Sequence, residues 1–363
     1  MFDYSMKRFD WYIIKRFFST FFFSITLILL IVIIFDISEK IDDFLESEAP
    51  FRAVIFEYYL NFIPYFSNLF SPLFIFISVI FFTSKMANNT EIIAILNSGM
   101  SFWRLSIPYL ISAILLASAS FIAGNFIIPP ANKIRIDFEN KYIKSKFRSG
   151  EKNIHLQIRK GQYVYMESYN STKDIAYKFA LENIKDGTLR SKLNANYIQW
   201  NSTSGKWHVP KYQIRIFEED GEKIVNGKNL DTLINLNPND FKTRLNKVET
   251  MNLFELNNYI EKEQLKGTTN IVYHKIEKYK RMAFPFASII LTIIGLAVAS
   301  NKIRGGIGLH LGVGLLISFT YILFMQISTT FATNDNLSVG FAVWLPNILY
   351  TILAFFLIDK VPK

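Results

Sequence analysis

Six long apolar runs, three near each end, constrain the fold more than any other feature of this 363-residue chain. Each run has 19 to 25 residues and contains no Asp, Glu, Lys or Arg. About 20 helical residues cross a hydrocarbon layer ~30 Å thick, because an α-helix rises about 1.5 Å per residue. The sequence therefore predicts six membrane-spanning helices. They cover residues 17–35, 62–84, 106–128, 282–300, 307–331 and 339–358.

A polar stretch of 149 residues, 133–281, separates the third run from the fourth. Its first part contains short β-branched and aromatic segments, separated by turn signals such as Lys160-Gly161, Ser204-Gly205 and Asn226-Gly227. This pattern is typical of an all-β sandwich or jelly roll. From Asn252 onward the apolar spacing becomes helical. The predicted strands are residues 154–158, 162–166, 177–184, 196–200, 206–209 and 213–217.

We expect an α-helical integral membrane protein with six transmembrane helices and an extracytoplasmic all-β, jelly-roll-like domain. The expected divisions are spans 1–3 in residues 1–132 with a short cytoplasmic helix at 89–100, the β domain in 133–250, a helical stalk in 251–281, and spans 4–6 in 282–363.

The short loops predict the orientation, because Lys and Arg are retained on the cytoplasmic side of a membrane. Residues 36–61 hold seven acids and only two bases, and residues 332–338 hold no base. Both termini are therefore predicted in the cytoplasm and the central domain outside. The bases on the cytoplasmic side are Lys7, Arg8, Lys15, Arg16, Lys85, Arg104, Lys302, Arg304, Lys360 and Lys363.

Several classes of chemistry lack the residues they require. The chain has no cysteine, which excludes disulfides and thiolate chemistry, and no phosphate-binding loop for ATP. His155, His208, His274 and His310 lack metal-ligand spacing. The net charge of +10 could attract nucleic acid, but in a membrane protein it more often sets topology. We expect no catalytic residues, metal, cofactor or nucleic acid, and energy for work must come from a partner chain or an ion gradient. The spans lack the mid-membrane ionisable groups of proton-coupled carriers.

The loop between the second and third runs predicts a short helix. Asn89 or Thr90 is a candidate cap, Glu91 places an acid in the first turn, and Gly99 is a candidate stop. Such a helix can sit in the groove of a partner protein. The alternative is an interfacial helix that lies on the membrane, since half of its residues are apolar.

The chain resembles the lipopolysaccharide-export permease family, LptF/LptG, over nearly its whole length. The resemblance rests on the layout of three spans, a β domain and three spans, on the segment EIIAILNSGMS at residues 91–101, and on Pro130, Asn132 and Arg135. Residues 278–286 and 299–308 are also similar to the family, and the second half resembles the LptG member more than the LptF paralogue.

This resemblance implies a permease subunit of an ABC transporter in the bacterial inner membrane. The implied partners are a cytoplasmic ATPase dimer, a paralogous six-span permease, periplasmic β jelly-roll bridge proteins and lipopolysaccharide itself. Glu91 and Gly99 would belong to the coupling to the ATPase. Gly308, Gly312 and Gly314 would form part of a lateral lipid gate with span 1, although a Gly-x-x-x-Gly spacing equally serves packing within one chain.

One departure from the family concerns recognition of lipid phosphate. Some members carry a basic residue near the outer end of span 1, where this chain has Asp36. Either the lipid carries fewer phosphates, or other bases take over this contact. The candidates are Lys40, Arg52, Lys133 and Arg135. Two other functions stay open: a membrane-anchored envelope assembly or scaffold protein, and an exporter of another amphipathic lipid.

Overall fold

The computed structural model describes most of the chain in ten segments. Of the bases on which the predicted orientation rests, Lys7, Lys302, Arg304 and Lys363 lie outside them. The described residues are 8–143, 152–170, 173–185, 187–218, 221–236, 238, 245–266, 271–301, 306–334 and 337–361.

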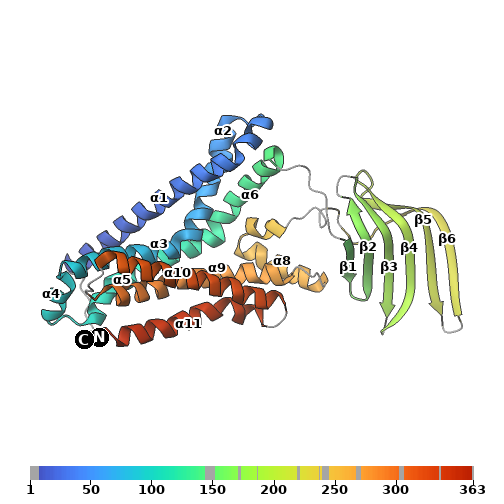
Figure 1. The fold of residues 1–363 in the computed structure, drawn as a ribbon. Coiled ribbons are helices and arrows are strands. Elements are labelled where there is room, and N and C mark those ends of the chain that lie inside the picture. The colour runs from blue at the N-terminus through green and yellow to red at the C-terminus, as the bar shows by residue number, and fades with distance from the viewer. Residues whose placement is uncertain are drawn as a thin grey trace. The chain divides into compact units, whose positions relative to one another are not determined.

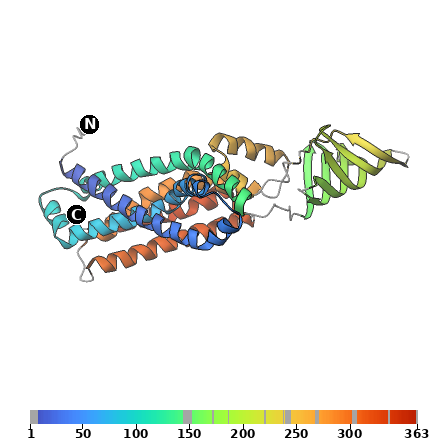
Figure 2. The same ribbon diagram turned by 90° about the horizontal axis from the view of Figure 1, so that it is seen from above.

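Six helical segments are long and apolar enough to cross a membrane, and each coincides with one of the predicted apolar runs to within one residue or contains it (Figures 1 and 2). Two of them include short π-helical turns, at η1, η2 and η3. The first segment is α1 (Arg8–Glu46). The second is α2 (Phe51–Ala53), η1 (Val54–Tyr59) and α3 (Leu60–Asn88). The third is α5 (Phe102–Ile122), η2 (Ala123–Ile127), α6 (Ile128–Phe138) and η3 (Glu139–Ile143). The last three are α9 (Ile271–Ala299), α10 (Gly306–Thr333) and α11 (Val339–Asp359).

Helix α3 holds the bundle together because two of its faces pack into separate apolar clusters. Ile75 and Val79 lie among side chains of α1 and α5. Phe76 and Ile80 lie among side chains of α9, α10 and α11. All four are fully buried. One residue step along a helix rotates the side chain by about 100°, so neighbouring residues reach different partners.

The β domain is one antiparallel sheet of six strands in the order β1-β2-β3-β4-β5-β6 (Figure 1). The all-β prediction is confirmed, but the described strands form an up-and-down meander in a single sheet and not the two sheets of a jelly roll. The strands are β1 (Lys152–Arg159), β2 (Gln162–Asn170), β3 (Ile175–Lys185), β4 (Thr188–Asn201), β5 (Lys206–Glu218) and β6 (Gly221–Thr232).

Two details of the strand prediction were wrong. The two segments predicted on either side of Pro210 form the single strand β5. Asn226-Gly227, predicted as a turn, lies inside β6 and pairs with β5. Gly227 is opposite Tyr212, and a Cβ built there would lie 2.3 Å from the Tyr212 ring. A glycine fits here because the Tyr212 ring of the neighbouring strand occupies the place of its side chain, and a larger residue would have to displace that ring.

The sheet has one apolar and one polar face, as side chains alternate along each strand. Val164, Leu181, Leu193 and Ile214 are in register across four strands and belong to the apolar cluster of the domain. The residues beside them, Tyr163, Glu182, Lys192 and Arg215, are in register on the other face.

The segment after β6 closes the apolar face. The indole Nε1 of Trp207 donates to the carbonyl oxygen of Leu236 at 2.9 Å, and Asn235 Nδ2 donates to the carbonyl oxygen of Ile158 on β1 at 3.1 Å. Ile234 and Leu236 are buried in the same apolar cluster. The interior of the domain is therefore filled by its own side chains.

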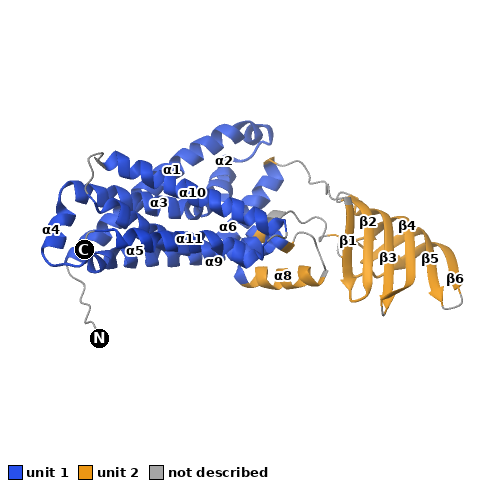
Figure 3. Cartoon of the chain, turned by 60° about the horizontal axis from the view of Figure 1, so that its bottom comes forward, with its two compact units in different colours: residues 1–142, 249–253, 272–363 blue, residues 143–248, 254–271 orange. Residues whose placement is uncertain are grey.

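The chain divides into two compact units (Figure 3). One contains residues 1–142, 249–253 and 272–363, and the other contains residues 143–248 and 254–271. The boundary differs from the expected one at residue 133, because the third helical segment continues through α6 and η3 and packs with the bundle. The expected stalk is also divided, since α8 (Leu253–Lys266) groups largely with the sheet and α9 with the bundle.

Candidate coupling helix, lipid gate and β domain

The short helix between the second and third spans is α4 (Glu91–Asn97). It lies at the end of the bundle where α1 begins and α11 ends, here called the α4 end (Figure 1). Gly99 has a φ of +87° and ends the helix, as predicted. The predicted side-chain cap is wrong. Thr90 has a φ of +63°, and its Oγ1 donates to the carbonyl oxygen of Asn89 at 2.6 Å and does not accept a hydrogen bond from the first turn.

Helix α4 has one buried face and one open face. Ile92 is 1% exposed and packs in the apolar cluster that contains Phe17 of α1 and Phe102 of α5. On the opposite face Ile93 is 43% exposed, and Ala94 and Asn97 are exposed beside it. The helix is thus fixed to the bundle on one side and offers the other side to a partner.

The carboxylate of Glu91 has two hydrogen bonds within the chain. Tyr12 of α1 donates its hydroxyl to Oε2 at 3.2 Å, and Asn89 Nδ2 donates to Oε1 at 3.1 Å. The guanidinium of Arg16 lies 4.6 Å from the centre of the Tyr12 ring. Glu91 is half-buried, so it is oriented by α1 before any partner binds.

A buried ion pair that the sequence did not predict lies at the same end. Arg104 of α5 donates from both terminal nitrogens to the two oxygens of Asp10 in α1, at 2.6 and 2.7 Å. The side chain of Asp10 is fully buried and that of Arg104 is 23% exposed. An acid at the start of one apolar helix and a base at the start of another are its only signals in the sequence.

The three glycines expected at a lipid gate have different surroundings. A Cβ built at Gly308 or Gly312 would meet no atom within 4 Å, so these two lie on the open side of α10. A Cβ at Gly314 would lie 2.3 Å from Cδ1 of Ile80 in α3. Gly314 therefore serves packing within this chain, and only Gly308 and Gly312 are available to a second subunit or to lipid.

We expect Gly314→Leu to destabilise the protein and Gly312→Leu to leave its stability nearly unchanged. Ile80 is fully buried, so a larger side chain at position 314 overpacks the contact between α3 and α10, at a cost of about 1–3 kcal/mol or more. Exposed substitutions change stability by about 0.5 kcal/mol or less. Thermal unfolding of the two purified variants in the same detergent measures the difference. Equal melting temperatures would contradict the assignment of Gly314 to internal packing.

The buried residues of helix α1 all lie in its first half. Its buried residues end at Ile25, while farther along Leu30, Ile34 and Phe35 are 58%, 63% and 71% exposed. Residues 26–35 therefore offer an apolar surface to lipid or to another subunit, while Asp36 and Phe44 farther along contact Tyr58. The second half of α1 lies on the far side of the bundle from α4 (Figure 1).

The four candidate phosphate contacts fall into two groups. Lys40 lies 2.7 Å from Asp36 Oδ1 and also contacts Tyr58, and Arg135 lies 3.2 Å from Glu139 Oε1. These two charges are already paired. Arg52 and Lys133 are exposed and form no ion pair among the described residues. The free bases are thus the stronger candidates for an anionic headgroup.

Charged side chains also surround Glu249 in the unit that contains the bundle. Burial raises the pKa of the Glu249 carboxyl above its usual 4.5, and the negative charge of Glu277 raises it further, while Arg135 and Arg281 oppose the shift. Asn132 Nδ2 donates to the backbone oxygen of Glu249 at 3.4 Å, and Arg281 donates to that of Met251 at 2.7 Å. These bonds fasten residues 249–251 to α6 and α9.

The raised pKa of Glu249 predicts that Glu249→Gln stabilises the protein at pH 8. A carboxyl with a raised folded-state pKa favours folding while it is protonated, and this contribution is lost as pH rises from 4.5 through the raised value. The amide resembles the protonated acid and has no such dependence. Melting temperatures between pH 5 and 8 measure the effect, and the advantage of the variant should shrink toward pH 5. A variant advantage that grows toward pH 5 would contradict the direction of the shift.

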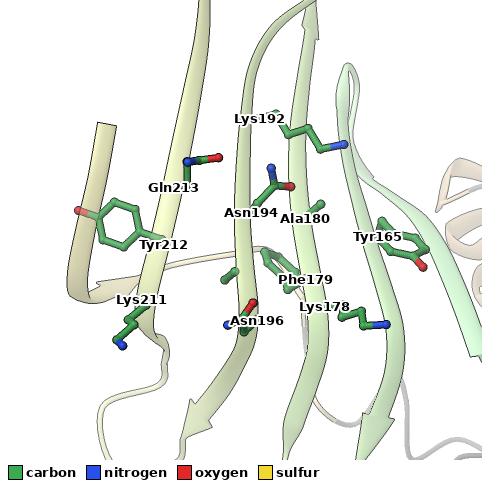
Figure 4. Close-up of a pocket in the computed structure, with 11 residues that line it drawn as sticks. Tyr165, Lys178, Phe179, Ala180, Lys192, Asn194, Asn196, Lys211, Tyr212 and Gln213 are labelled. Atoms are coloured by element: carbon green, nitrogen blue, oxygen red, sulfur yellow. The ribbon is translucent and has the colours of Figure 1, made fainter. Parts of the chain in front are cut away.

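The polar face of the sheet has a shallow hollow of about 490 Å³. Figure 4 shows Lys178, Lys192 and Lys211 on three neighbouring strands, with Asn194 and Asn196 between them. Lys178 lies 2.8 Å from Glu167, and Lys192 lies 2.8 Å from Glu182. Two of the three charges are therefore paired, which is typical of the solvated side of a half-buried sheet.

Among the described residues, no group of three or more His, Asp or Glu side chains is placed to hold a metal ion. His310 is buried, and its Nδ1 lies 2.8 Å from Ser84 Oγ, which joins α10 to α3. This contact gives His310 a packing role.

Comparison with known proteins gives one decisive result. The family model described as "Lipopolysaccharide export system permease LptF/LptG" matches residues 11–360. The chain belongs to this family. Comparison with curated proteins gives no match.

Membership of the LptF/LptG permease family agrees with the architecture, since the match extends from α1 through the β domain to α11. LptF/LptG proteins are permease subunits of lipopolysaccharide export, a transport function and not an enzymatic one. The family model covers LptF and LptG together, so the closer likeness of this chain to LptG stays a prediction.

Proposed function

We propose that the chain is one of two permease subunits that extract lipopolysaccharide from the inner membrane and pass it to a periplasmic bridge. The observation that carries this proposal is the family match over residues 11–360. ATP hydrolysis is assigned to a dimer of separate ATPase chains, because this sequence has no phosphate-binding loop.

In this proposal the α4 end faces the cytoplasm. Lys15, Arg16, Lys85, Arg104 and Lys360 support this orientation. The open face of α4 then docks on the ATPase, with Glu91 oriented toward it by Tyr12 and Asn89. Gly99 sets the direction in which the chain leaves the helix.

The lipid route begins beside the second half of α1. This surface lacks buried residues, and the open glycines Gly308 and Gly312 on α10 allow close approach of a helix from the paralogous subunit. Their exposure and lack of an ion pair among the described residues support Arg52 and Lys133 as contacts for lipid phosphate, with the paired Lys40 and Arg135 in a secondary role. The β domain then receives the lipid, and an exposed sheet edge can continue into the bridge.

Purification of the complex from native membranes in lipid nanodiscs tests the proposal. Mass spectrometry should identify an ATPase, a second six-span permease and bound lipopolysaccharide. Recovery of the chain without an ATPase would favour an envelope scaffold protein, and a different bound lipid would favour an exporter of that lipid. Either result would replace the proposed function.

A further inference from the structure

The ion pair between Asp10 and Arg104 joins two helices at the point where α4 is anchored. Arg104 lies in the first turn of α5, directly after the loop that follows α4, and its backbone N–H donates to the capping oxygen of Ser101 at 3.3 Å. Asp10 lies in the first turn of α1. The two residues are 94 positions apart in the chain, so only the fold brings them together.

The ion pair contributes more to the orientation of α1 relative to α5 than to the stability of their contact. Ile13 and Phe17 of α1 already pack with Phe102 and Leu105 of α5 in one apolar cluster. A buried ion pair is weak support for stability, because both charges lose hydration. Two parallel hydrogen bonds to a planar guanidinium, in contrast, restrict the angle between the partners. The geometry therefore sets how α1 is oriented relative to the start of α5.

Helix α1 is built to transmit a change of that angle. Its 39 residues include no Pro or Gly, so it has no sequence cause for a kink. Its second half is joined to η1 and α6 by hydrogen bonds from Tyr58 and Tyr59 to Asp36 and by the packing of Phe44 on Tyr58 and Phe138, but its buried residues end at Ile25. Beyond that point about 30 Å of helix extends to Glu46, and a tilt of about 5° would move the far end by about 3 Å.

We infer that Asp10 and Arg104 are positioning residues that couple movement of α4 to tilting of α1, and thereby to opening of the lipid gate. The inference rests on the proposed function, since it takes α4 as the site that the ATPase moves. The bond between Tyr12 and Glu91 is a second, longer link, which joins α1 directly to α4. The guanidinium pair is shorter and carries opposite charges, so it is the main link.

The test uses the full complex with its ATPase and lipopolysaccharide in nanodiscs. The chain has no cysteine, so Leu45→Cys at the far end of α1 and Phe341→Cys on α11 accept spin labels without background. Both positions are exposed, at 71% and 49%. The distance between the labels is compared in the nucleotide-free and vanadate-trapped states, together with ATP hydrolysis and lipid release.

In the complex that keeps the Asp10–Arg104 ion pair, we expect the distance between the two spin labels to change by a few ångströms on vanadate trapping. Arg104→Lys keeps the charge but loses the two parallel bonds, and should abolish this change and reduce lipid release at least ~10-fold, with ATP hydrolysis within about twofold. Arg215→Lys is the control, because Arg215 also forms two hydrogen bonds to one carboxylate, that of Glu222, in an exposed pair of the β domain. It should leave the distance change and lipid release unaltered.

If Arg104→Lys does not fold, the double variant Asp10→Asn/Arg104→Gln replaces it, since two amides can hydrogen-bond without a buried charge. Normal label movement and release in whichever variant assembles would overturn the inference, as would transport by the wild type without movement of α1. A wild-type complex that lacks the ATPase or lipopolysaccharide overturns the proposed function instead.

Discussion

Replacement of Glu91 by Lys should abolish productive association with the ATPase while the permease remains folded and inserted. Reversal of charge at a docking surface costs about 2–5 kcal/mol, which corresponds to a loss of affinity of about 30-fold or more. Within the permease the change removes two hydrogen bonds to Tyr12 and Asn89, each worth about 1 kcal/mol. Co-purification of the ATPase and lipid-stimulated ATP hydrolysis measure the effect.

Two companion variants separate docking from internal support. Tyr12→Phe removes the bond from α1 but leaves the Glu91 carboxylate in place. It should reduce coupling far less than Glu91→Lys does. Glu91→Gln keeps an acceptor for Tyr12 and removes the charge. The loss of ATPase association in this variant therefore measures the electrostatic contribution of Glu91. Wild-type transport by a stable Glu91→Lys protein would remove α4 as the coupling site.

Deletion of the β domain should abolish transfer of lipid to the periplasmic bridge without preventing insertion of the spans. Residues 150–247 are replaced by a short flexible linker. The six spans lie in a separate compact unit and carry their own hydropathy. In a reconstituted system, ATP hydrolysis should persist while lipid transfer to the bridge falls to background. Undiminished transfer would exclude the domain from the route.

A point variant tests the same domain without a change of chain length. Trp207 is fully buried and donates to Leu236, so Trp207→Ala should cost about 3–5 kcal/mol and unfold the sheet selectively. Leu233 lies in the nearby closing segment but is 77% exposed. Leu233→Ala is therefore the matched control and should transfer lipid normally. Protease protection of the domain shows whether each variant is folded.

The sequence alone determined those features that depend on neighbouring residues. Hydropathy over about 20 residues located all six spans, because each span must satisfy its backbone within one segment. Alternation and turn residues indicated the β domain, and Gly99 indicated the end of α4. Some strand ends were predicted wrongly. Gly227 resembles a turn residue in the sequence, yet only its neighbour across the sheet, Tyr212, explains its place inside β6.

Tertiary structure decided which residues of one chemical type can act on a partner. Gly312 and Gly314 are two positions apart, but one faces open space and the other faces Ile80. Lys40 and Arg52 are both basic, but only Lys40 is paired with an acid. Asp10 and Arg104 meet across 94 positions. Local sequence sets helix, strand and hydropathy, whereas the pairing of charges and the facing of side chains depend on how distant segments pack.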